Sequence, residues 1–168
     1  FVHVEIQGGY QVGFAERMFV YYYRIFDYYR KLSGKHKEIA SFAVLGDLDE
    51  NWKPDSYSRS IWGSNLDFKF SVSKLLSLNI SDSEIEKIKN PFEIVVRAHL
   101  KTKQTVNSPE DRQRWKIAIS RALFRAGFSI EVVRDVFRLI ASMMVLPPEM
   151  EVKMLQEVKT VVEEEKMD

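Results

Sequence analysis

The first ten residues, FVHVEIQGGY, alternate apolar and polar side chains and then reach a pair of glycines. Successive side chains of a β-strand point to opposite faces, and next-but-one neighbours lie roughly 6.5–7 Å apart. The odd positions therefore form a polar row of His3, Glu5 and Gln7, while the even positions form an apolar row. This spacing predicts a strand at residues 1–7 that presents an imidazole, a carboxylate and an amide to one partner surface.

The next two segments predict a helix and a second strand. The stretch FAERMFVYYYRIFDYYRKL carries apolar or aromatic residues at helical spacing, which predicts a helix over residues 14–32. EIASFAVLGD is a nearly continuous apolar run, which predicts a strand over residues 39–46 that is covered on both faces.

A long connection and an alternating segment follow. We interpret residues 48–65, LDENWKPDSYSRSIWGSN, as a loop whose aromatic residues Trp52, Tyr57 and Trp62 are packing anchors. In LDFKFSVS the apolar residues alternate with polar ones, which predicts one strand over residues 66–72 with a solvated face.

The remaining chain has helical texture. Ser81 and Glu84 are typical of a capping box, and Asn90 before a proline marks the start of another helix. Two further helices are predicted over residues 109–126 and 130–144. Capping residues, a glycine stop and breaking prolines support these bounds at Ser108, Gly127, Ser129, Pro147 and Pro148. We expect a core at residues 1–78 and a helical region at 79–168 that pack as one unit.

Composition restricts the possible functions. The chain has no Cys, which excludes disulfides, thiolate metal sites and a Cys nucleophile, and which fits a reducing compartment. The sequence contains no run of eighteen apolar residues and no signal-peptide pattern at its start, so we expect a cytoplasmic protein with no membrane partner. The net charge is +1, so affinity for nucleic acid must come from local clusters of cations. A chain that begins inside a strand also suggests a fragment.

The polar row of the opening strand suits metal-dependent hydrolysis of a phosphodiester. Mg²⁺ takes oxygen ligands and keeps several waters, so one or two carboxylates on neighbouring strands suffice to hold it. Glu5 and the carbonyl of Ile6 are candidate ligands, and Gln7 is a candidate for orienting water or phosphate by hydrogen bonds. His3 is a further candidate for contacting phosphate. The alternative is an ordinary solvated strand face, and the alternation does not decide between them.

Cations and phenol rings share one side of the predicted long helix. Arg17, Tyr21 and Arg24 follow helical spacing, and Tyr28 and Lys31 continue the row. This mixture favours contact with a DNA backbone, while an amphipathic solvated face remains the alternative. A second basic run between positions 101 and 125 spreads around its helices, and we interpret it as solvated surface.

The chain resembles a known family over nearly its whole length. The stretches that carry the resemblance are HVEIQGGYQVGFAERMFVYYYRIFDYYRK, IASFAVLGD, NWKPDSYSRSIWG, NPFEIVVRAHLKT and VLPPEMEVKM. In this order they are similar to the Rpn-type recombination-promoting nuclease and putative transposase family of the PD-(D/E)xK nuclease superfamily. The resemblance implies an α/β fold, with a partial PD-(D/E)xK nuclease-like mixed sheet flanked by helices and an α-helical C-terminal region.

The same resemblance implies a Mg²⁺-dependent DNA endonuclease. Glu5 and Gln7 match the second half of the family motif, so Glu5 is expected to be catalytic and to bind the metal, and Gln7 to be catalytic. The motif's Asp strand is expected before Phe1, so the chain is expected to be truncated ahead of its first metal-binding strand. In the superfamily the following helix flanks the active site, which favours DNA contacts for Arg17, Tyr21 and Arg24.

A rival hypothesis is a catalytically incomplete module that binds DNA or another protein, and a homo-oligomer is possible under either hypothesis.

Overall fold

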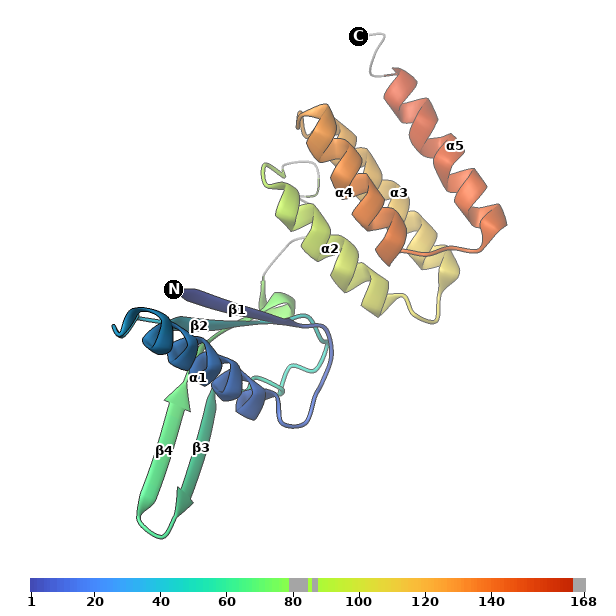
Figure 1. Ribbon diagram of the computed structural model, residues 1–168. Helices are drawn as coiled ribbons and strands as arrows, with labels where there is room; N and C mark the ends of the chain where they lie inside the picture. Colours follow the sequence, from blue (N-terminus) through green and yellow to red (C-terminus); the bar gives the residue numbers. More distant parts are fainter. Residues whose placement is uncertain (79–84, 86–87, 165–168) are drawn as a thin grey trace. The chain divides into compact units, whose positions relative to one another are not determined.

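The computed structural model of the chain describes residues 1–78, 85 and 88–164 (Figure 1). It divides into two compact units, Phe1–Leu78 and Asn79–Asp168. The first is α/β, and the second is helical in its described residues. The predicted α/β class is therefore confirmed, while the nuclease-like topology stays a prediction. The predicted capping box at Ser81 and Glu84 lies outside the described residues.

The first unit begins with a parallel strand–helix–strand arrangement. β1 spans Val2–Gln7, α1 spans Phe14–Ser33 and β2 spans Ala40–Leu45. These elements confirm the predicted strand at 1–7, the helix at 14–32 and the strand at 39–46, with small changes of their bounds. β1 and β2 pair in parallel, with His3 opposite Ser41.

The rest of the first unit departs from the prediction in two places. Residues predicted to be a loop form a strand, β3 (Ser56–Ile61), which pairs antiparallel with β4 (Ser64–Lys69). The predicted single strand at 66–72 is divided between β4 and β5 (Ser71–Lys74), and a 3₁₀ turn, η1 (Leu75–Ser77), follows. β5 joins a separate parallel sheet of order β1-β2-β5.

The division falls at Phe70, whose side chain is buried and whose N–H donates to the carbonyl of Asp55. Apolar residues alternate without interruption from Leu66 to Val72, so the pattern contains no signal for the change of sheet. The segment SYSRSI also alternates, and it leads into the turn at Trp62 and Gly63. Its pattern is therefore typical of a hairpin strand and not of the predicted loop.

α1 covers one face of the parallel sheet (Figure 1). Phe14 and Met18 are buried against Ala43, Leu45 and Phe70. Burying such large apolar side chains contributes roughly 1.5–3 kcal/mol each, so this contact holds the helix in place over the strands.

The opposite face of the sheet is open in this unit. The even positions of β1 are exposed, and Phe42 on β2 is 41% exposed. The prediction that the second strand is covered on both faces is therefore wrong. The continuous apolar run at residues 39–46 indicates that both faces of the strand are hydrophobic, but it does not show whether another element covers each face.

The second unit contains four helices among its described residues. They are α2 (Pro91–Gln104), α3 (Pro109–Arg125), α4 (Ile130–Met143) and α5 (Pro148–Glu164). The helices predicted at 109–126 and 130–144 are confirmed to within one residue.

The predicted caps are also present in the second unit. The side chains of Asn90, Ser108 and Ser129 each accept a hydrogen bond from a backbone N–H of the first turn. Such caps satisfy N–H groups that have no partner inside the helix.

Two cations of α3 are structural. The Nζ atom of Lys116 lies 2.7 Å from an oxygen of Glu151 on α5, and Lys116 is fully buried. The interpretation of the basic run as solvated surface is therefore wrong for Lys116. Arg112 donates to the backbone carbonyls of Thr102, Thr105 and Val145 at 3.1–3.2 Å. It thus satisfies carbonyls at the carboxyl ends of α2 and α4.

We expect Arg112→Ala to lower the free energy of unfolding by about 1–3 kcal/mol, because the carbonyls of Thr102 and Val145 lose this donor and that of Thr105 keeps only the N–H of Ser108. The matched control is Arg114→Ala, whose side chain is 77% exposed on the same helix and pairs only with Asp111 among the contacts described. The control should lose less than about 0.5 kcal/mol. Urea unfolding followed by far-ultraviolet circular dichroism measures both, and equal midpoints would contradict the assigned role.

Candidate functional site

The polar row of β1 is turned inward. His3 is buried, Glu5 and Gln7 are half-buried, and the apolar row on the other side is exposed. A covered polar side chain must find partners, because burial without hydrogen bonds costs several kcal/mol. The partners come from α1, whose first turns lie across β1.

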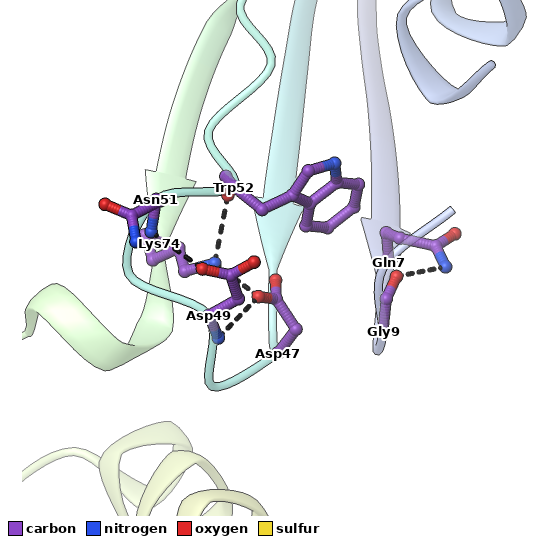
Figure 2. Close-up of polar contacts among 7 residues, drawn as sticks. All are labelled: Gln7, Gly9, Asp47, Asp49, Asn51, Trp52 and Lys74. Carbon is purple, nitrogen blue, oxygen red and sulfur yellow. Dashed lines mark hydrogen bonds and ion pairs between the residues drawn. The ribbon is translucent and has the colours of Figure 1, made fainter. Parts of the chain in front are cut away.

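Arg17 joins the two predicted catalytic residues. Its Nη2 atom lies 3.1 Å from Glu5 Oε1 and donates to Gln7 Oε1 at 2.7 Å. Its Nη1 atom donates to Gln11. The amide of Gln7 is fixed at its other end, because Nε2 donates to the carbonyl of Gly9 at 2.8 Å (Figure 2). One guanidinium therefore sets the orientation of both side chains.

Tyr21 and His3 continue the contact between α1 and β1. The two rings meet edge to face at a centroid distance of 6.1 Å, and His3 Nδ1 lies 3.2 Å from Ser41 Oγ. The Nε2 atom of His3 is buried and has no hydrogen-bond partner among the residues that the structure describes. Arg24, two turns after Arg17, is exposed. The structure thus brings together Glu5, Gln7 and Arg17, and leaves Arg24 apart from them.

Glu5 fits a magnesium ion as a single ligand. Its Oε1 atom lies 3.1 Å from Arg17, and its side chain is 23% exposed, so the carboxylate can be reached from solvent. Ala40 and Gly46 donate to the carbonyls of Phe1 and Gln7, so the odd carbonyls of β1 point toward β2. The carbonyl of Ile6, at an even position, points to the other side and is open to a ligand.

No group of three or more His, Asp or Glu side chains is arranged for a metal ion in the part of the chain that the structure describes. Glu5 by itself therefore falls short of a metal site, and an ion bound there would need waters and a further acid as ligands.

A buried ion pair, which sequence reasoning missed, lies at the carboxyl ends of β2 and β5. Lys74 Nζ donates to Asp47 Oδ1 at 2.5 Å and to the carbonyl of Trp52 at 3.0 Å (Figure 2). The two charged side chains are 2% and 7% exposed. The residues are far apart in the sequence, and only the pairing of β2 with β5 brings them together.

The ion pair fixes the conformation of the loop at residues 47–52, which follows β2. Asp47 Oδ1 also accepts from the N–H of Asp49, and Asp49 Oδ1 accepts from the N–H of Asn51, both at 2.9 Å. Trp52 then packs edge to face against Phe14 of α1. The D-x-D-x-N spacing after a buried strand was the available signal for this folded loop.

Comparisons with family models, with curated proteins and with solved structures found no match. The resemblance to Rpn-type nucleases therefore stays a hypothesis that depends on the sequence stretches given above. Among the described residues, no helix is long and apolar enough to cross a membrane.

We expect Lys74→Met to lower the free energy of unfolding by about 3–5 kcal/mol, because it leaves the Asp47 carboxylate buried without its cation. The double variant Asp47→Asn, Lys74→Met should be less destabilised, since it removes the unpaired charge and keeps an oxygen for the N–H of Asp49. Lys69→Met, at an exposed position of β4, is the control. Urea unfolding monitored by tryptophan fluorescence gives these values, and a single variant as stable as the control would contradict the account.

Proposed function

We propose that the first unit is the core of a Mg²⁺-dependent DNA endonuclease of the transposase and recombination-associated type. The observation that carries this proposal is the Arg17 bridge: one guanidinium joins Glu5 and Gln7 on the inner face of a parallel strand. A carboxylate, an amide and a cation within hydrogen-bond reach of one another supply three of the groups that phosphodiester hydrolysis uses.

Each of the three side chains has a separate role in this mechanism. Glu5 and the carbonyl of Ile6 would hold the ion, which when bound supplies charge neutralisation and a more acidic water. Gln7 orients the attacking water or a non-bridging phosphate oxygen by hydrogen bonds. The water oxygen forms a bond to phosphorus and one water proton passes to solvent. The bond from phosphorus to the leaving oxygen breaks, and the leaving oxygen takes up a proton from solvent to give an alcohol.

Arg17 supplies the positive charge that Gln7 lacks. A guanidinium is permanently protonated, and its planar donors match the oxygens of a phosphate. Arg17 also keeps Glu5 and Gln7 in fixed orientation before substrate arrives. Arg24, exposed on the same helix, and Tyr21 between them extend the proposed contact with the DNA backbone.

The proposed centre needs a second carboxylate. Mg²⁺ held by Glu5 alone binds weakly, and the family resemblance implies an Asp on a strand ahead of β1. We therefore propose that the active form includes this strand.

A rival function is a catalytically incomplete module that binds DNA. The observation that favours it is that Arg17 and Gly9 already satisfy contacts of Glu5 and Gln7 without a metal. The rival predicts DNA binding with no Mg²⁺-dependent cleavage in any form of the chain.

Plasmid nicking in Mg²⁺ and in chelator tests the proposal. We expect little cleavage by residues 1–168 alone and clear cleavage by a longer form that includes the upstream Asp strand. In the longer form, Glu5→Ala should abolish cleavage because it removes the metal ligand. Gln7→Ala should reduce the rate by up to about 100-fold through loss of positioning, while Mg²⁺ binding persists.

The matched control is Glu50→Ala, which removes an exposed acid of the loop after β2. Its cleavage rate should equal that of the unsubstituted form. Full cleavage by the Glu5→Ala variant would contradict the proposed nuclease centre, and DNA binding without cleavage by the longer form would favour the rival.

A further inference from the structure

The turn of the β3–β4 hairpin carries a tryptophan whose side chain does not pack against the rest of the first unit. Ile61 pairs with Ser64, so Trp62 and Gly63 form a two-residue turn. Trp62 is 99% exposed, and its neighbour Ile61 is 65% exposed. The hairpin extends away from α1 and the parallel sheet of the first unit (Figure 1). The expectation that Trp62 is a packing anchor is therefore wrong.

Trp62 is also in an unfavourable backbone conformation. Its φ is +47° and that of Gly63 is +83°, as a type I′ turn requires. A left-handed conformation is unfavourable for a residue with a Cβ, and Asn or Gly is the usual choice at this position. An indole that is both strained and fully hydrated contributes nothing to folding. Such local conflicts are expected where a residue serves function.

The end of the hairpin that lies opposite the turn packs against α1, so the turn projects from the first unit in a fixed direction. Tyr57 stacks on Phe19 of α1 at a centroid distance of 5.6 Å, and its hydroxyl donates to Glu16. On the opposite strand, Phe68 packs against Tyr22. These contacts fix the direction in which the turn projects from the unit.

The side chains near the tip are polar and carry a cation. Arg59 is exposed and lies opposite Leu66, so no acid faces it across the hairpin. On the other face, Ser60 donates to Asn65 and Ser58 donates to Asp67. The surroundings of Trp62 thus offer a guanidinium on one face of the hairpin, and hydroxyls, an amide and the Asp67 carboxylate on the other.

We propose that Trp62 stacks on an unpaired base of DNA, with Arg59 at the adjoining phosphate. This inference rests on the proposed function for its ligand, but it concerns binding and not cleavage. An aromatic plane beside a cation is the combination by which proteins hold single strands, and every base offers a face for stacking. Unpaired bases are preferred because a paired base has both faces covered by its neighbours.

The tip fits other partners less well. Membrane-surface segments use a long apolar face beside many Lys or Arg side chains, whereas this tip offers only Trp62 and Ile61 as apolar groups. A protein hot spot is surrounded by contacts that exclude water, and a two-residue turn has too little surface for such a ring.

The test measures binding of the full chain to a fluorescein-labelled single-stranded oligonucleotide by anisotropy, in chelator so that nothing is cleaved. Trp62→Asn keeps a residue that the turn tolerates, so its melting temperature should not fall. Its affinity should drop about 5- to 150-fold, the equivalent of one lost stacking contact. The dependence of affinity on salt should stay unchanged, because stacking releases no counterions.

Two further variants sharpen the test. Trp62→Phe keeps an aromatic plane and should recover part of the affinity. Arg59→Ala should lower the slope of log affinity against log salt by about 0.7, the value for one phosphate contact on a single strand.

Unchanged affinity of the Trp62→Asn variant would overturn the inference, as would absence of binding by the unsubstituted chain. Trp62-dependent binding to vesicles of anionic phospholipid, or Trp62-dependent self-association in sedimentation, with no effect on DNA, would overturn it in favour of that partner. If the longer form never cleaves but Trp62 still controls binding, the nuclease proposal fails and this inference stands.

Discussion

The contact of Arg17 with Glu5 and Gln7 decides how the first unit is arranged. A strand with one polar and one apolar row normally turns the apolar row toward its covering helix. Here the polar row is inside, and the apolar row is exposed. In that orientation α1 brings a guanidinium and the Tyr21 ring to the polar row, while Phe14 and Met18 bury their side chains further across the sheet. A polar inner row under a helix makes a protected place for chemistry.

The carboxyl ends of the parallel strands form the second fixed region. Gly46 donates to the carbonyl of Gln7, so β1 and the loop after β2 are joined directly. Lys74 then closes that loop through Asp47 and the carbonyl of Trp52. The sheet therefore holds Gln7 by its backbone, while Arg17 holds it by its side chain. The positioning role proposed for Gln7 requires such a constraint, because small displacements at a reacting centre cost large factors in rate.

Local patterns predicted the elements that depend on local physics. The alternation of apolar and polar residues predicted β1, and the helical spacing of apolar residues predicted α1. Capping residues such as Ser108 predicted where helices of the second unit begin. Three features depend on contacts between distant residues and had no local signal. These are the change of sheet at Phe70, the pairing of Lys74 with Asp47, and the covering of only one face of β2. Within the candidate site, the spacing placed Glu5 and Gln7 on one face of β1, while their catalytic roles are implied by the family resemblance and stay predictions. The pairing of Arg17 with them depends on the packing of α1 on β1 and had no local signal. The exposure of Trp62 has no local signal, because an indole in a connecting segment usually packs and only the pairing of β3 with β4 places this one at a turn.

The central claim is that Glu5 on the inner row of β1 is a metal ligand. Anomalous diffraction from crystals of the longer form, which includes the upstream Asp strand, tests it most directly after a soak in Mn²⁺, an ion that shares the oxygen ligands of Mg²⁺. The account predicts a peak at coordination distance from a Glu5 oxygen and near the carbonyl of Ile6, and no such peak in crystals of the Glu5→Gln variant. A fully occupied Mn²⁺ site elsewhere in the first unit, with Glu5 still paired only to Arg17, would contradict it.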